Sequence, residues 1–155
     1  MAATMPLVIA LFFLSIVALA SALMLPEWQA QADVAVADAG ATSLLAYRQG
    51  VVDFLNANPS FAGTVPDAVI SFPAGYVRDP RWTNLVQAGG TLYVFEAAAH
   101  SAHTDQVLDQ IHRKTLQSFG VGRNASGQLV GASGFATGIL VPATVPNGAL
   151  LMVGR

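Results

Sequence analysis

The chain has 155 residues, of which 54% are hydrophobic and 10% are charged, whereas an average soluble domain has roughly 25% charged residues. The formal net charge is −2 and the seven basic residues are scattered, so no basic stripe is available to neutralise a run of phosphates, and no nucleic-acid partner is expected. Because the chain has no cysteine, disulfides, thiol catalysis and Cys-ligated metals are excluded.

The first 26 residues carry no charge, and Leu7–Leu25 forms an uninterrupted apolar run in which only two serines are polar. A helix of about 20 apolar residues matches the hydrocarbon thickness of a bilayer. We therefore predict an N-terminal transmembrane anchor (or signal segment) at 1–26 and a periplasmic α+β domain at 27–155. The alternative is a cleaved signal peptide, since the small-x-small pattern of a cleavage site occurs at Ala20–Ala22 and again at Ala30–Ala32.

The orientation of the anchor rests on segment lengths, because the first basic residue after the apolar run is Arg48, too distant for the positive-inside rule. A tail of a few residues can remain in the cytoplasm while the larger C-terminal part is exported. We predict a single-pass protein of the bacterial inner membrane with its C-terminal domain in the periplasm. The N-terminus lacks the Gly and Glu of a prepilin peptidase site, so it is not that of a standard type IV pilin.

A long helix is predicted over 33–57, where apolar residues recur at spacings of 3, 4 and 7 and Gly40 and Gly50 weaken the pattern. Arg48 falls on or beside the apolar stripe, so it must pack its stem along the core or pair with a carboxylate or carbonyl group. Asn58–Pro59 ends the helix, because the residue before proline avoids the helical conformation.

Short β-branched or aromatic runs bounded by Gly, Pro and Asn follow. They predict strands at Val65–Phe72, Trp82–Val86, Thr91–Glu96, Gln128–Val130, Thr137–Val141 and Ala149–Val153. A second helix is predicted from Thr104 to Phe119, and Gly120 ends it. The predicted fold is α+β and pilin-like: the transmembrane helix runs into a long helix that packs on a mostly antiparallel sheet with one crossing helix.

No pattern indicates catalysis or a cofactor. The three histidines, His100, His103 and His112, lack the spacing of a two-histidine metal face, so no metal is expected. Gly120–Ala125 has the outline of a dinucleotide fingerprint but follows a helix instead of a strand, and Gly131–Phe135 departs from a nucleophile elbow, so both are interpreted as turns. We predict that the protein is not an enzyme and binds no nucleotide.

Three residues are candidate partner contacts: Tyr47, Arg48 and Trp82. Aromatic and Arg side chains dominate the energetics of protein interfaces. In a domain of this size the same aromatic side chains are also typical core residues, and that alternative stays open.

Four segments carry a family resemblance: LLAYRQGVVDFLNANPSFAG, ISFPAGYVRDPRWTNLVQAGGTLYVFEAA, SFGVGRNASGQLV and VPATVPNGALLMVGR. Together with the N-terminal apolar segment they resemble the PilM family of type IVb (thin, conjugative-type) pilus systems. An actin-like, nucleotide-binding protein of type IVa systems shares that name but not this pattern. The resemblance rests on packing and turn residues, so it implies a biological process and no catalytic site.

The resemblance implies a non-enzymatic envelope component of type IVb pilus assembly, in conjugative DNA transfer, that acts through contacts with other pilus assembly proteins or pilins at the inner membrane. One alternative is a minor pilin incorporated in the fibre. Another is a periplasmic enzyme or binding module released by cleavage of the signal segment.

Overall fold

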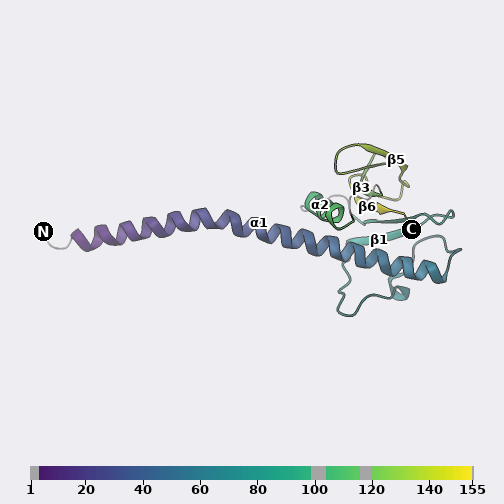
Figure 1. The fold of residues 1–155 in the computed structure, drawn as a ribbon, viewed down its shortest axis with the longest axis horizontal. Coiled ribbons are helices and arrows are strands. Elements are labelled where there is room, and N and C mark those ends of the chain that lie inside the picture. The colour runs from purple at the N-terminus through teal and green to yellow at the C-terminus, as the bar shows by residue number, and fades with distance from the viewer. Residues whose placement is uncertain (1–3, 99–103, 116–119, 155) are drawn as a thin grey trace. The chain divides into compact units, whose positions relative to one another are not determined.

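A computed structural model of the chain describes residues 4–98, 104–115 and 120–154, without the side chains of 4–8, 20 and 22–27. The chain divides into two compact units, Met1–Ala35 and Val36–Arg155. Helix α1 (Thr4–Ala57) contributes to both. All other elements belong to the second unit (Figure 1).

In the first unit, α1 exposes large apolar side chains between positions 9 and 19 on every side of the helix: Ile9, Leu11, Phe12, Phe13, Leu14, Ile16, Val17 and Leu19. Ser15 and Ser21 each donate a hydrogen bond of 2.8 Å to the carbonyl oxygen four residues earlier, so these hydroxyl groups are satisfied within the helix. Across the residues that the structure describes, no helix is both long enough and apolar enough to cross a membrane.

The second unit contains a six-stranded sheet in the order β1-β2-β6-β3-β4-β5, in which every neighbouring pair is antiparallel. The α+β class and the antiparallel sheet are therefore confirmed. The strands are β1 (Trp82–Val86), β2 (Leu92–Glu96), β3 (Val121–Ala125), β4 (Gln128–Val130), β5 (Ala136–Leu140) and β6 (Leu150–Val153).

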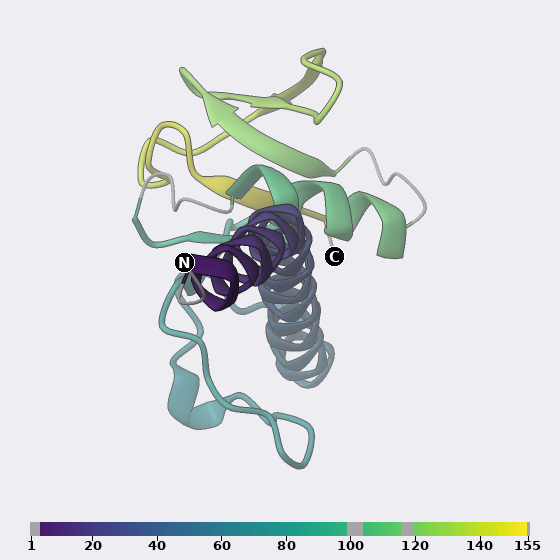
Figure 2. The same cartoon turned by 90° about the vertical axis from the view of Figure 1, so that its left-hand side faces the viewer.

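The larger core lies between one face of this sheet and two helices, α1 and α2 (Thr104–Lys114). Figure 2 shows both helices beside the sheet. The stripe predicted for α1 is buried there, including Ala41, Leu44, Val51 and Leu55. A smaller cluster on the other face joins Tyr93 and other apolar side chains to the segment 141–149.

The two glycines of α1 are close-packing positions. A Cβ at Gly50 would lie 2.6 Å from Ile70 Cγ2 and 2.9 Å from the Ser71 carbonyl oxygen. A Cβ at Gly40 would lie 3.1 Å from Val107 Cγ2 on α2. Glycine thus lowers helix propensity at both sites but lets a neighbouring segment approach the helix.

The strand predicted at Val65–Phe72 is wrong. This segment contains the short 3-10 helix η1 (Asp67–Val69) and otherwise has no regular structure. Its backbone is held by a side chain: Asn84 Oδ1 accepts a hydrogen bond of 2.8 Å from the Val65 N–H, and Asn84 Nδ2 donates one of 3.0 Å to the Val65 carbonyl. A buried amide therefore provides the pairing that a neighbouring strand would have supplied.

The turn predicted at Gly120–Ala125 is also wrong, because Val121–Ala125 is strand β3 near the centre of the sheet. The turn consists of Ser126 and Gly127, which both have positive φ (52° and 85°) and connect β3 to β4. Gly122 is required in β3, because a Cβ there would overlap the Val130 carbonyl group. The predicted end of the second helix at Phe119 lies outside the described residues.

Candidate functional site

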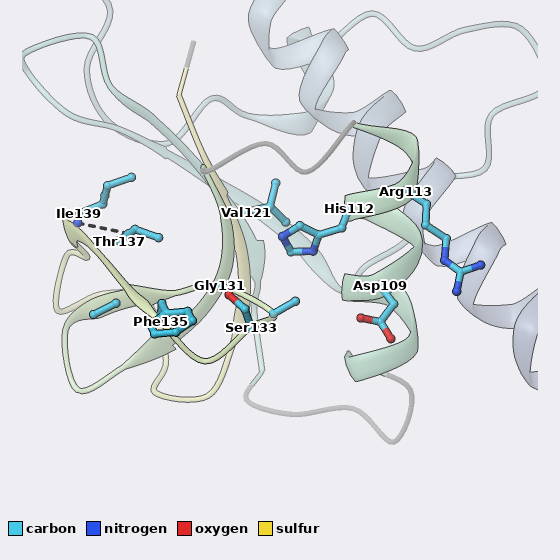
Figure 3. A pocket seen from close by; sticks show the side chains of 11 residues that line it. Asp109, His112, Arg113, Val121, Gly131, Ser133, Phe135, Thr137 and Ile139 are labelled. Carbon is cyan, nitrogen blue, oxygen red and sulfur yellow. Dashed lines mark hydrogen bonds between the residues drawn. The ribbon is translucent and has the colours of Figure 1, made fainter.

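A hollow with a volume of about 790 Å³ lies between α2 and the β4–β5 hairpin (Figure 3). Its sheet side carries the apolar side chains of Val121 from β3, Phe135 from the hairpin turn and Ile139 from β5, beside the hydroxyl groups of Ser133 and Thr137. Its helix side carries Asp109, His112 and Arg113. Phe135 is 77% exposed. A hollow of this size can accept one or two large side chains.

One imidazole enters this hollow from the helix side. His112 Nδ1 lies 2.9 Å from the Leu108 carbonyl oxygen one turn earlier in α2. A carbonyl oxygen can only accept, so Nδ1 carries the proton and donates. Nε2 is then left to meet a ligand from the hollow, toward which the ring points in Figure 3.

A second hollow of about 440 Å³ adjoins the first and shares Gly131 and Ala132 with it. Its lining includes Arg123 from β3 and Asp105 from the first turn of α2. We call the two hollows together the α2–hairpin trough. It has an apolar end at Val121 and a cationic end at Arg123.

The guanidinium group at the cationic end is not fully hydrogen-bonded within the part of the chain that the structure describes. The Arg123 guanidinium forms an ion pair with Asp105, but the Asp105 side chain is 74% exposed and so is held only loosely. Arg123 Nε and the NH2 group that faces Asp105 are both buried, and neither forms a hydrogen bond in this part of the chain. The cationic end therefore offers the guanidinium group of Arg123 to an acceptor that displaces Asp105.

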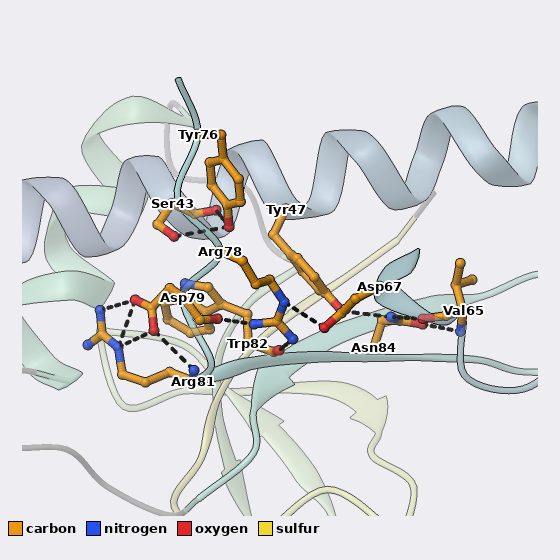
Figure 4. A network of polar contacts seen from close by, with 10 residues as sticks. All are labelled: Ser43, Tyr47, Val65, Asp67, Tyr76, Arg78, Asp79, Arg81, Trp82 and Asn84. Carbon is orange, nitrogen blue, oxygen red and sulfur yellow. Dashed lines mark hydrogen bonds and ion pairs between the residues drawn. The ribbon is translucent and has the colours of Figure 1, made fainter. Parts of the chain in front are cut away.

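A polar cluster between α1 and β1 holds parts of the segment 65–81 in place (Figure 4). The Tyr47 hydroxyl donates to Asp67 Oδ1 at 3.1 Å and accepts from Asn84 Nδ2 at 2.8 Å. Arg78 Nε pairs with Asp67 Oδ2 at 2.8 Å, and its guanidinium carbon lies 4.8 Å from the centroid of the Tyr47 ring. This Tyr47–Asp67–Arg78 cluster connects three segments that are distant in sequence.

Burial raises the pKa of Tyr47 to about 12. The hydrogen bond from Asn84 lowers the pKa, and the negative charge of Asp67 raises it. Nearby, burial opposes ionisation of Asp79, but the hydrogen bonds from Arg81 hold the pKa of Asp79 below its usual value. Tyr47 is therefore a neutral hydrogen-bonding group at every physiological pH and is not poised to act as a base.

Arg48 connects α1 to the segment after β6. Its guanidinium NH2 group donates a hydrogen bond of 3.1 Å to the Gly154 carbonyl oxygen. Burial lowers the pKa of Arg48 from its ordinary value. The expectation that Arg48 pairs with a carboxylate or carbonyl group is confirmed, and the partner is a carbonyl.

Comparison with known proteins gives one family. The sequence pattern of the PilM family matches residues 11–153, almost the whole chain. The chain belongs to the PilM family. At the level of the family, this relates it to pilus biogenesis.

Two crystal structures of PilM proteins are similar to the chain. The PilM protein from Escherichia coli B7A has 17% sequence identity and a TM-score of 0.57, over 77% of this chain and 92% of that one. This similarity supports the fold. The PilM protein from Pseudomonas aeruginosa 2192 is 31% identical over 76% of this chain and 95% of that one, with a TM-score of 0.40. No curated protein matches the chain.

For this PilM-family chain the sequence suggested three partner contacts. Trp82 is fully buried and Tyr47 is 1% exposed, so both side chains lie in the core, and Arg48 is half-buried against Gly154. The structure brings Tyr47 and Trp82 to one cluster, because Arg78 NH2 also donates to the Trp82 carbonyl at 2.7 Å, and leaves Arg48 elsewhere. Contacts of these residues with a partner stay a prediction.

Of the three histidines, only His112 lies among the residues that the structure describes. His112 lines the trough, whereas His100 and His103 lie outside the described residues. In the described part of the chain no three His, Asp or Glu side chains are grouped as a metal site. Sequence reasoning missed Arg123 as a site residue, because only the fold shows that its Nε is buried without a partner.

Proposed function

We propose that the chain is a non-enzymatic envelope component of type IVb pilus assembly in conjugative DNA transfer, and that it acts through protein–protein contacts. The observation that carries the proposal is the match to the PilM family over residues 11–153, which includes most of the apolar N-terminal segment and the α+β domain. The α2–hairpin trough, with its exposed Phe135, supports a contact function, because aromatic anchors next to a hollow are typical of binding surfaces.

The proposed location is the bacterial inner membrane, with a single N-terminal span and the second unit in the periplasm. The support comes from the charge-free run Leu7–Leu25 and from the apolar side chains that surround α1 between positions 9 and 19. A helix that is apolar on all sides needs an apolar environment on all sides. A bilayer provides such an environment.

The test of function is an in-frame deletion of the gene in a host that carries its thin-pilus genes. We expect loss of thin pili in electron micrographs and a strong fall in conjugation frequency in liquid medium. The full-length gene supplied in trans should restore both. Normal piliation and transfer in the deletion strain would refute the proposal.

Topology is tested separately in spheroplasts that express the full chain. An external protease should degrade 27–155, whereas a cytoplasmic marker protein should remain intact. The mass of the chain purified from membranes then distinguishes a retained anchor from cleavage after Ala22 or Ala32. A protease-resistant domain in intact spheroplasts that becomes sensitive after lysis would place the domain in the cytoplasm and refute the proposed location.

A further inference from the structure

We propose that the α2–hairpin trough binds an extended segment of a partner polypeptide in which a large apolar side chain and a carboxylate are two residues apart. This inference rests on the proposed function, since it names the kind of surface through which the contacts are made. The carboxylate would reach Arg123 at the cationic end, and the apolar side chain would occupy the end lined by Val121, Phe135 and Ile139.

Charge complementarity favours a carboxylate at the cationic end. Arg123 presents a cation whose Nε is buried without a hydrogen-bond partner in the described part of the chain. Its ion-pair partner Asp105 is an exposed side chain on the first turn of α2 and can turn into solvent. A planar guanidinium binds a carboxylate through two parallel hydrogen bonds, so an entering carboxylate can replace Asp105 and also satisfy Nε.

The spacing of the two ends favours an extended chain. Val121 and Arg123 are two residues apart on β3, so their side chains lie on the same face of the sheet, about 7 Å apart along the strand. Residues i and i+2 of an extended peptide have the same spacing and also share a face. A peptide that lies along β3 can therefore place its apolar side chain and its carboxylate in the two ends at once, with His112 Nε2 available beside it.

The experiment measures binding to the full chain in detergent micelles. The probe is a fluorescein-labelled peptide, Ser-Thr-Phe-Thr-Glu-Thr-Ser with blocked termini, followed by fluorescence anisotropy. A control peptide with Gln in place of Glu should bind roughly tenfold more weakly, the effect of one charge-assisted hydrogen bond. A second control peptide with Ala in place of Phe should lose about tenfold or more.

Three variants of the protein make the test specific. Arg123→Gln should weaken binding of the Glu peptide and abolish its advantage over the Gln peptide. Asp105→Asn should strengthen binding of the Glu peptide, because it removes the competing carboxylate. Lys114→Gln is the matched control: it also removes a cation from an ion pair with an aspartate, here Asp38 at 2.9 Å, but it lies outside the trough and should change nothing.

The opposite signs expected for Arg123→Gln and Asp105→Asn separate binding from a structural role, since damage to the fold would weaken binding in both. Equal affinity for the Glu and Gln peptides, weaker binding by Asp105→Asn, or no binding would each overturn the inference. Displacement of the peptide by millimolar inorganic phosphate but not by chloride would assign the cationic end to a free anion. Self-association that Arg123→Gln abolishes would assign the trough to a second copy of the chain, and this result also overturns the inference.

Failure of this inference is distinguishable from failure of the proposed function. A deletion strain without pili, combined with a protein that binds none of these peptides, would retain the pilus role and remove the trough as its surface. Normal piliation of the deletion strain would refute the pilus role whatever the peptides show.

Discussion

Gly50→Ala provides a direct test of how α1 packs in the second unit. In an exposed helix interior this substitution should stabilise the protein by about 1 kcal/mol, because alanine has a higher helix propensity. Here the new Cβ would lie 2.6 Å from Ile70 Cγ2 and 2.9 Å from the Ser71 carbonyl oxygen. The carbonyl belongs to the backbone, and the Ile70 methyl group is on a stiff β-branched side chain that is 7% exposed.

Neither neighbour can move away easily, so the segment 66–72 must shift from the helix. Overpacking of this kind costs about 1–3 kcal/mol. After subtraction of the propensity gain we expect Gly50→Ala to lower the free energy of unfolding by about 1 kcal/mol. The sign of the effect is thus opposite to that expected for an exposed helical glycine.

The assay is urea unfolding of the full chain in mild detergent, followed by tryptophan fluorescence. A Trp28→Phe background makes the signal report on Trp82, which is fully buried, whereas Trp28 is exposed. Gly89→Ala is the matched control, since a Cβ at Gly89 would contact nothing within 4 Å. The control should be neutral or slightly stabilising. A rise in stability for Gly50→Ala, equal to or larger than that of the control, would refute the close packing.

Three further substitutions test the polar cluster and the sheet. Tyr47→Phe should cost about 1–3 kcal/mol at neutral pH, because it removes both hydrogen bonds of the buried hydroxyl. The substitution should also reduce the loss of stability at alkaline pH. The pKa of Tyr47 is about 12 in the folded chain against 10.0 ordinarily, so its contribution to the free energy of unfolding is complete below pH 10 and is lost as the pH rises through 12. An identical fall of the free energy of unfolding in the Phe variant, in urea titrations from pH 8 to 12, would contradict this assignment. Asn84→Ala leaves the buried backbone groups of Val65 without partners and should cost about 2–4 kcal/mol in the same assay, whereas a cost near zero would mean that Asn84 does not hold this segment. Gly122→Ala should separate β3 from β4 and reduce amide-exchange protection of Gln128–Val130, and unchanged protection would exclude the overlap with Val130.

The fold was predicted best where a local pattern matches a packed element. The 3-4-7 spacing in 33–57 is the buried stripe of α1, and the two runs around Ala88–Gly90 form the hairpin of β1 and β2, because such periodicity records which side of an element meets the core. The segment Val65–Phe72 has the composition of a strand, but Asn84, 19 residues away from Val65, determines its conformation. Sequence patterns contain no record of that distant amide.

Strand β3 was missed for a different reason. Gly122 and Asn124 are typical turn residues, yet both are required in this strand. Gly122 allows the close approach of Val130, and Asn124 Nδ2 donates 2.8 Å and 3.2 Å hydrogen bonds to the Val145 and Pro146 carbonyls. Arg123 was missed as a site residue for a similar reason. Its role depends on Nε being buried, which only the assembled sheet and α2 create.

The position of β6 has a consequence for biosynthesis. Leu150–Val153 follows every other strand in the chain but lies between β2 and β3, where it joins the β1–β2 and β3–β4–β5 parts of the sheet. As the ribosome makes the chain from its N-terminus, the β1–β2 hairpin and the three-stranded β3–β4–β5 part can form separately, but they cannot join into one sheet until β6 has emerged. A nonsense mutation that removes only this strand should therefore yield a chain that is degraded instead of a shortened but folded domain.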